Sequence, residues 1–121
     1  MGFVQTILDQ AFSTIGKNFT DVMIRAVGCD TVGDYAIKEK RLLKSADLLK
    51  GTVQAKRGDV FLLLYKQGQY GWAHTGIVTN VQGTKLTTIE GNTNNNGSRE
   101  GYELLQRERD ISSGTIDIYS I

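Results

Sequence analysis

The chain has 121 residues, of which 40% are apolar and 22% are charged, and its formal net charge is +1. These values are typical of an ordinary soluble protein with one domain, here residues 1–121. They exclude a charge field that would draw the chain onto nucleic acid or an anionic membrane. The longest apolar run, Val60 to Tyr65, is too short to span a bilayer, and a single cysteine excludes an internal disulfide.

The first part of the chain, residues 1–50, has the pattern of helices. Apolar residues recur every three to four positions from Phe3 to Ile15, which predicts an amphipathic helix. Glycines and capping residues mark where the later helices begin and end. The predicted helices are residues 3–15 ending at Gly16, 21–27 ending at Gly28, 31–41 capped by Asp30, and a last turn over 46–49 capped by Ser45 and ended by Gly51.

The second part, residues 57–121, has the pattern of strands. The apolar run from Val60 to Tyr65 predicts a strand covered on both faces. Helices followed by successive strands predict an α+β fold, with N-terminal helices packed on an antiparallel sheet. The predicted strands are residues 60–65, 73–81, 85–90, 102–107 and 115–121, with a turn at Gly58-Asp59 and polar loops at 67–71 and 92–101.

One predicted hairpin carries the only histidine, His74, and Glu90. A three-residue loop, Val81-Gln82-Gly83, is a common hairpin connection and would centre the pairing on Gln82. His74 then lies directly opposite Glu90, with Cβ atoms about 5 Å apart, and Asn92 follows on the same face. The loop length decides this inference, because a two-residue loop would place Glu90 on the opposite face.

A carboxylate or amide beside an imidazole fixes its tautomer and stabilises the imidazolium, as a general base requires. The alternative is a cross-strand ion pair between His74 and Glu90 without chemistry. Geometry alone favours this alternative, because one histidine and one glutamate on a hairpin is a common coincidence. A zinc site is a weaker interpretation, since His74 has no cysteine or second histidine nearby. We expect no metal and no cofactor.

Three motifs in this order resemble the CHAP family of cysteine amidases and endopeptidases. They are Arg57-Gly58-Asp59-Val60-Phe61-Leu62, His74-Thr75-Gly76-Ile77-Val78 and Thr88-Ile89-Glu90-Gly91-Asn92-Thr93. The continuation from Asn94 to Tyr102 resembles a subset in phage lysins and bacterial cell-wall hydrolases. The resemblance implies a papain-like, NlpC-type fold that acts on peptidoglycan, with His74 as the base and with Glu90 and Asn92 as the residues that orient it.

The nucleophile of that family is a cysteine at the start of its first helix, in a Trp-Cys-x-x-Phe-Val pattern. Phe3-Val4 match the end of this pattern, so the cysteine would stand one place before Met1. The resemblance therefore implies a hydrolase domain that is inactive as given. Cys29 is the alternative nucleophile, because a helix N-terminus near its sulfur would lower its pKa. A structural role for Cys29 is the more common situation.

Three functions are open: a CHAP-like peptidoglycan hydrolase domain, a non-catalytic module that binds cell-wall peptides, and a phage structural component that keeps only the fold. We expect peptidoglycan or a cell-wall peptide as the partner, no nucleic acid, and a monomer. Trp72 would line a substrate groove or pack at the sheet edge, and Asn94 and Arg99 would bind substrate or hold their own loop. The N-terminal residues lack the pattern of a secretory signal, and the resemblance implies a phage or bacterial origin. The basic run Lys38, Lys40, Arg41 and Lys44, interrupted by Glu39, is interpreted as a solvated face.

Overall fold

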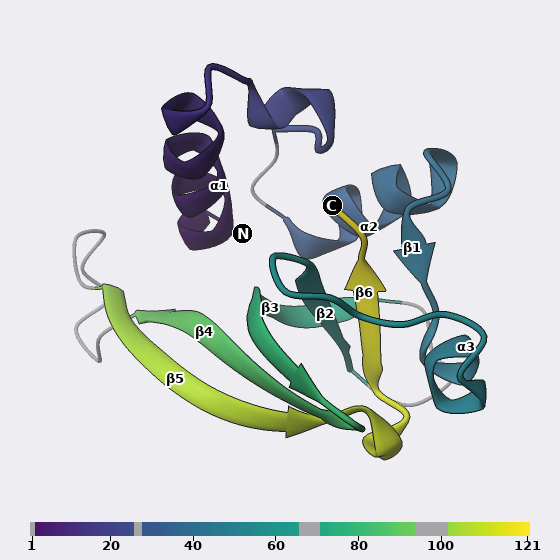
Figure 1. Cartoon of the computed structure of the whole chain (residues 1–121). Helices are drawn as coiled ribbons and strands as arrows, with labels where there is room; N and C mark the ends of the chain where they lie inside the picture. The colour runs from purple at the N-terminus through teal and green to yellow at the C-terminus, as the bar shows by residue number, and fades with distance from the viewer. Residues whose placement is uncertain (1, 26–27, 66–70, 94–101) are drawn as a thin grey trace.

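The computed structural model describes residues 2–25, 28–65, 71–93 and 102–121, and only the backbone of residues 92–93 and 102–103. The fold is α+β, with one six-stranded antiparallel sheet of strand order β1-β6-β2-β3-β4-β5 (Figure 1). The elements are α1 (Gly2–Thr14), η1 (Phe19–Asp21), α2 (Cys29–Lys38), β1 (Leu42–Leu43), α3 (Ser45–Lys50), β2 (Val60–Leu64), β3 (Trp72–Gln82), β4 (Lys85–Thr93), β5 (Tyr102–Asp110), η2 (Ile111–Ser113) and β6 (Ile116–Tyr119).

The predicted first and last helices are confirmed as α1 and α3, and both are followed by a glycine with positive φ, Gly16 and Gly51. The helix predicted over 21–27 is wrong for the residues that the structure describes there, 21–25, because the 3-10 turn η1 ends at Asp21 and no helix follows it up to residue 25. Two β-branched residues, Val22 and Ile24, lower helix propensity there, and a seven-residue helix is marginal in any case.

The third predicted helix begins two residues earlier than expected, at Cys29, with Gly28 at the N-cap position. Asp30 does not cap it, since its carboxylate accepts a hydrogen bond from the Trp72 backbone N–H at 2.8 Å. The helix ends at Lys38 rather than Arg41, because Lys40 has a left-handed φ of 59°. Ser45 is likewise the first residue of α3 and not its cap, and its N–H donates to Asp117 at 2.8 Å.

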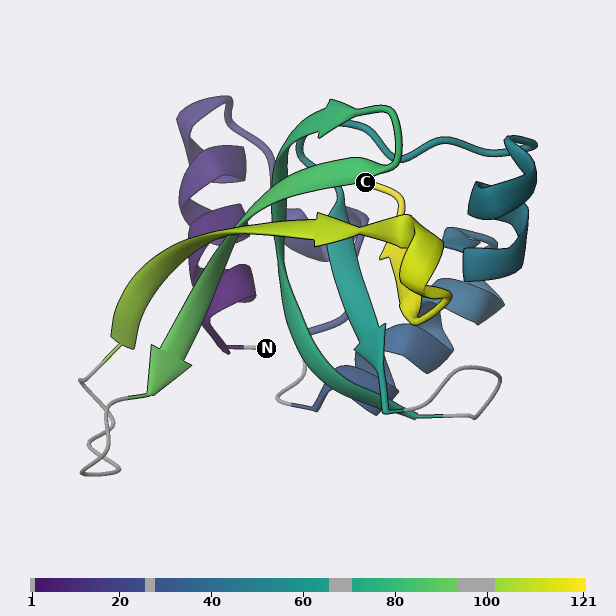
Figure 2. The ribbon, with the colours of Figure 1, turned by 90° about the horizontal axis from the view of Figure 1, so that it is seen from below.

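The predicted strands are all present, and the structure changes their ends. β3 and β4 form a hairpin, β5 pairs with the outer edge of β4, and the last strand, β6, returns to lie between β1 and β2. β1 is a two-residue strand that the helical pattern of the first fifty residues concealed. β4 and β5 are longer than predicted, and Figure 2 shows them as curved ribbons that project away from β6.

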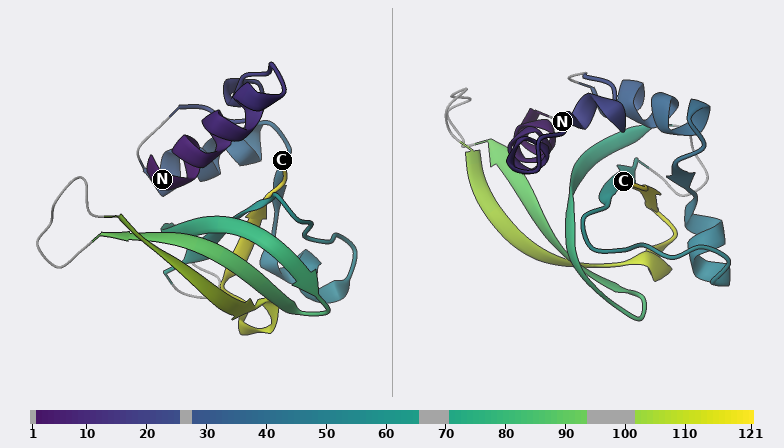
Figure 3. Two further views of the ribbon diagram at one scale, coloured as in Figure 1. Left: turned by 60° about the vertical axis from the view of Figure 1, so that its left-hand side comes forward. Right: turned by 45° about the horizontal axis from the view of Figure 1, so that its top comes forward.

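Side chains on the two faces of the sheet form two separate cores. We call one the α1/α2 face, because Val60 and Leu62 pack there against residues of α1 and α2 such as Val4 and Val32. The other is the α3 face, where Phe61, Val78, Leu86 and Ile118 pack with Leu48 of α3. The strand β2 is therefore covered on both sides, as its continuous apolar run predicted. In the right panel of Figure 3, β3 to β5 curve around the side on which α1 lies.

The Gly58-Asp59 turn is confirmed, and Gly58 has a positive φ of 93°. The Asp59 carboxylate is fully buried and accepts hydrogen bonds from the Lys56 backbone N–H, the Lys56 ammonium and the Ile121 backbone N–H at 2.9, 2.6 and 3.0 Å. This turn thus ties the start of β2 to Ile121.

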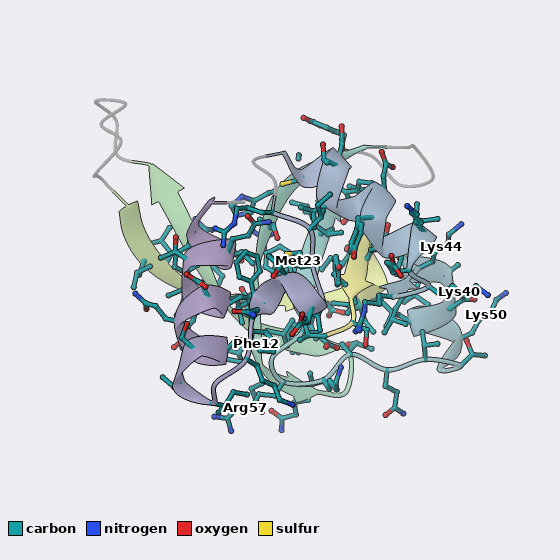
Figure 4. All side chains as sticks on the ribbon, turned by 90° about the horizontal axis from the view of Figure 1, so that it is seen from above. Phe12, Met23, Lys40, Lys44, Lys50 and Arg57 are labelled. Atoms are coloured by element: carbon teal, nitrogen blue, oxygen red, sulfur yellow. The ribbon has the colours of Figure 1, made fainter. Side chains whose placement is uncertain are left out.

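The lysines of the basic run are exposed to solvent, as predicted. Lys38, Lys40 and Lys44 are exposed, and Figure 4 shows Lys40 and Lys44 beside Lys50 at the edge of the molecule. Arg41 is the exception, since its guanidinium donates to the carbonyl oxygens of Ser120 and Ile121 at 3.3 and 3.2 Å. No helix in the described part of the chain is long and apolar enough to cross a membrane.

Candidate functional site

The imidazole of His74 lies on the α3 face of the sheet. His74 pairs with Leu63 of β2, and its ring meets the Phe61 ring edge-on at a centroid distance of 6.1 Å. A bulge between Leu63 and Leu64 shifts the register, so Trp72 falls on the α1/α2 face although it is only two residues from His74. The side chain of His74 is 35% exposed, which leaves part of the ring open to solvent.

His74 and Glu90 are in direct contact, as predicted: the distance from His74 Nε2 to Glu90 Oε1 is 2.7 Å. The predicted hairpin loop is wrong, because Gln82 pairs with Lys85 and the loop is the two residues Gly83-Thr84. With this two-residue loop and no other irregularity, Glu90 would point to the opposite face of the sheet from His74. A bulge at Thr79, between Val78 and Asn80, inserts one residue and restores the shared face.

The contact is diagonal rather than directly across the hairpin. Ile77 pairs with Ile89, and continuing this register by one residue places Gly76 opposite Glu90. A Cβ atom on Gly76 would lie 2.8 Å from Glu90 Cγ and 2.5 Å from Phe61 Cε1, so only glycine leaves room for both side chains. The Glu90 carboxylate can therefore lie over β3 and reach His74, which is two residues from Gly76.

The carboxylate of Glu90 is buried, with 1% of its side chain exposed, and it is saturated with hydrogen bonds. Oε1 accepts from His74 Nε2 and Arg109 Nη2, and Oε2 accepts from Arg109 Nε and Thr88 Oγ1, each at 2.7 Å. Burial alone would raise the pKa of Glu90. The hydrogen bonds from Arg109, Thr88 and His74 outweigh it and lower the pKa from 4.5 to about 2. Glu90 is thus an anion at neutral pH.

Sequence reasoning missed Arg109 and Thr88. The predicted strand ended at Arg107, so Arg109 was left outside the sheet. In the structure β5 continues to Asp110, and the pairing of Leu86 with Arg109 places this arginine on the same face as Glu90. The signal in the sequence is the spacing of two arginines, 107 and 109, on a strand that alternates faces.

The hydrogen bond to Glu90 fixes the tautomer of His74. A carboxylate anion only accepts, so Nε2 carries the proton, and the neutral ring presents Nδ1 as its free acceptor. Among the described residues none is hydrogen-bonded to Nδ1. An imidazole held in this way can take a proton from a neighbouring thiol or hydroxyl group and is stabilised by Glu90 when it becomes charged.

No family model matches this chain, and no curated protein and no solved structure matches it either. The resemblance to the CHAP family therefore remains a prediction.

The structure describes the other predicted polar site residues only in part. The backbone of Asn92 is in β4, opposite Glu103, but its side chain lies outside the described residues. Asn94 and Arg99 also lie outside the described residues. Within the described ranges, no three histidine, cysteine, aspartate or glutamate side chains cluster in a way that could hold a metal ion.

Trp72 is buried on the α1/α2 face, with 5% of the residue exposed. Its indole N–H donates to Asp117 at 3.0 Å, and its ring packs so closely on α2 that a Cβ atom on Gly33 would lie 2.3 Å from it. Of the two alternatives for Trp72, this environment favours packing in the core over contact with a substrate.

Cys29 is the first residue of α2 and packs at the margin of the core on the α1/α2 face, away from the imidazole of His74. Burial, together with the nearby Asp30 carboxylate, raises the pKa of its thiol. These features favour the structural interpretation of Cys29 over the nucleophilic one.

The first turn of α1 also lies on the α1/α2 face. Phe3 packs against Gly91 of β4, where an added Cβ atom would be 2.7 Å from the Phe3 ring. Gly91 faces away from Glu90, because successive residues of a strand point to opposite faces. The resemblance implied a nucleophile at the start of this helix, which would have to lie beside His74 to be activated by it. The structure instead places the first turn of this helix across the sheet from the imidazole, and Met1 itself lies outside the described residues.

Proposed function

We propose that this chain is a CHAP-like domain with a papain-like, NlpC-type fold that acts on peptidoglycan or a cell-wall peptide. The observation that carries the proposal is the contact between His74 Nε2 and the buried, ionised Glu90. Two further features support it. They are the α+β order of helices and antiparallel strands, and Gly76, which sits in the His-Thr-Gly motif and makes the contact possible.

In the proposed reaction, His74 Nδ1 takes the proton from a cysteine thiol, and the thiolate attacks the carbonyl carbon of a peptide or amide bond. The protonated imidazole then gives its proton to the leaving amine, and water hydrolyses the acyl-enzyme to restore the thiol. Glu90 holds the ring throughout and stabilises its charged form. The cysteine would stand immediately before Met1, as the resemblance implies.

The second candidate is a non-catalytic module that binds cell-wall peptides. One observation favours it: the first turn of α1 packs on Gly91, across the sheet from His74. A cysteine just before this turn would lie on the α1/α2 face, whereas His74 lies on the α3 face. Transfer of the thiol proton to His74 would therefore require α1 to shift relative to β4.

The test compares the chain as given with a chain extended by Trp-Cys before Met1. The hydrolase proposal expects the extended chain alone to clear a suspension of purified cell walls, followed as loss of turbidity. Replacing His74 with alanine in the extended chain should lower the rate about 10²- to 10⁴-fold, the usual contribution of a general base. Cys29→Ser is the matched control and should leave the rate unchanged.

Two results would contradict the hydrolase proposal. Clearing by the chain as given that disappears in Cys29→Ser would make Cys29 the nucleophile. A folded extended chain that binds cell walls in a pull-down without clearing them would favour the binding module.

A further inference from the structure

Arg109 is held at two sides by contacts that orient its guanidinium. Its Nε and Nη2 atoms donate in parallel to the two oxygens of Glu90, both at 2.7 Å. Its Cζ atom lies 5.1 Å from the centroid of the Phe61 ring, within reach of a cation–π interaction. Only 22% of the side chain is exposed. The same Phe61 ring contacts His74, so the side chains of Arg109 and His74, which both bind Glu90, pack against one aromatic ring.

Arg107 provides a natural comparison on the same strand and the same face. It pairs with Thr88, whose hydroxyl binds Glu90. It is two residues from Arg109 on the strand, so the two side chains point to the same face. Its Nε atom is 3.8 Å from Glu90 Oε1, too far for a hydrogen bond, and 53% of its side chain is exposed. The two arginines therefore carry the same charge near Glu90, but only Arg109 fixes the geometry of the carboxylate.

We propose that Arg109 is a positioning residue, which orients the base His74 by clamping Glu90 between its two guanidinium donors. The role rests on the proposed function of His74 as a base. Without Arg109, the buried carboxylate loses two of its four hydrogen bonds and its closest opposite charge. A carboxylate in that position takes up a proton or turns toward water. Protonation weakens the bond from His74 Nε2, because a neutral carboxyl oxygen is a poorer acceptor than a carboxylate, and turning toward water breaks it. In both cases the imidazole is held less firmly.

The geometry also explains why arginine and not lysine occupies this position. A guanidinium offers two parallel donors to a carboxylate and a flat face to an aromatic ring, whereas an ammonium is a single point charge. Arg109→Lys therefore keeps the charge near Glu90 and removes the clamp. Comparing it with Arg109→Met separates the effect of charge from that of geometry.

The test uses the fact that His74 is the only histidine of the chain. An imidazole N–H that is held in a hydrogen bond exchanges slowly with water and gives a signal in proton–nitrogen NMR spectra, and here that signal has one source. We expect it in the chain as given and in Arg107→Met, the matched control. We expect it to vanish in Arg109→Met, and in Arg109→Lys to exchange with solvent about tenfold faster, as for the loss of one hydrogen bond.

Removing Arg109 could unfold the chain, and Arg109→Lys keeps the test decisive in that case because it preserves the counter-charge. A folded Arg109→Lys chain whose histidine signal matches the unchanged chain would overturn the proposal. Equal losses of the signal in Arg107→Met and Arg109→Met would overturn it too, because the loss of one nearby charge would then explain the effect without the clamp.

Activity gives a second readout in the chain extended by Trp-Cys. Arg109→Lys should lower kcat with little change in KM, while Arg107→Met should leave kcat unchanged. If the extended chain cleaves nothing, the proposed function fails, and the NMR comparison still decides the role of Arg109.

Discussion

The hydrogen bonds that hold the buried Glu90 carboxylate make the stability of this protein depend on pH in a defined way. The folded state holds the pKa of Glu90 at about 2, against 4.5 for an unperturbed glutamate. A carboxyl group whose pKa is lower in the folded state stabilises the fold where it is ionised. This contribution is complete above about pH 5 and is lost as the pH falls toward 2. The difference in pKa corresponds to about 3 kcal/mol of free energy of unfolding.

The measurement is urea denaturation between pH 7 and pH 2, for the unchanged chain and for Glu90→Gln. Glutamine cannot ionise, so this variant lacks the Glu90 contribution at every pH. We expect it to be less stable by several kcal/mol at pH 7, because Arg109 then lacks its buried counter-charge. The two stability curves should approach each other by about 3 kcal/mol as the pH falls to 2.

The matched control is Glu108→Gln. Glu108 pairs with Lys85 at 3.2 Å, but its side chain is 64% exposed, and such pairs contribute little. Its stability curve should run parallel to that of the unchanged chain. If the Glu90→Gln curve were also parallel to it down to pH 2, the reasoning about the buried carboxylate would be refuted.

Two substitutions test the packing around the site. Gly76→Ala would place a methyl group 2.5 Å from Phe61 and 2.8 Å from Glu90, so we expect urea denaturation to show a loss of about 1–3 kcal/mol. Gly28→Ala is its control for steric contact, because the nearest atom is at 3.8 Å, and only the cost of alanine at a helix N-cap, about 1 kcal/mol or less, is expected. Trp72→Phe removes the indole hydrogen bond to Asp117 and should lower stability by about 1–3 kcal/mol without changing binding to purified peptidoglycan. Unchanged stability with lost binding would instead assign Trp72 to a substrate groove.

The sequence predicted the class of fold well, because the apolar patterns are strong. The spacing from Phe3 to Ile15 is helical over its whole length, and the run from Val60 to Tyr65 matches a strand that both cores cover. The segment over 21–27 was mispredicted because a short apolar pattern does not distinguish a helix from an irregular turn buried by its side chains. Met23 is fully buried there without a helix around it.

The sequence predicted one contact of the candidate site, but it predicted the wrong hairpin geometry for that contact. The contact between His74 and Glu90 is real, but the loop that was expected to produce it is not present. A bulge such as the one at Thr79 leaves little trace in a single sequence, because the backbone accepts it with ordinary residues. Arg109 could not be identified without the length of β5, which depends on its pairing with β4. The face occupied by α1 is likewise a property of tertiary packing.

The two irregularities of the β3–β4 hairpin have a consequence for how this protein can change. The short Gly83-Thr84 loop and the extra residue at Thr79 each invert the side-chain alternation, and together they cancel. An insertion or deletion of one residue at either place would turn Glu90 away from His74, even if the sheet itself still formed. A compensating change at the other place would restore the pair. Homologous chains of different hairpin length should therefore differ at both places at once, and a library that varies only the tip of the hairpin should lose the pair in every variant with an odd change in length.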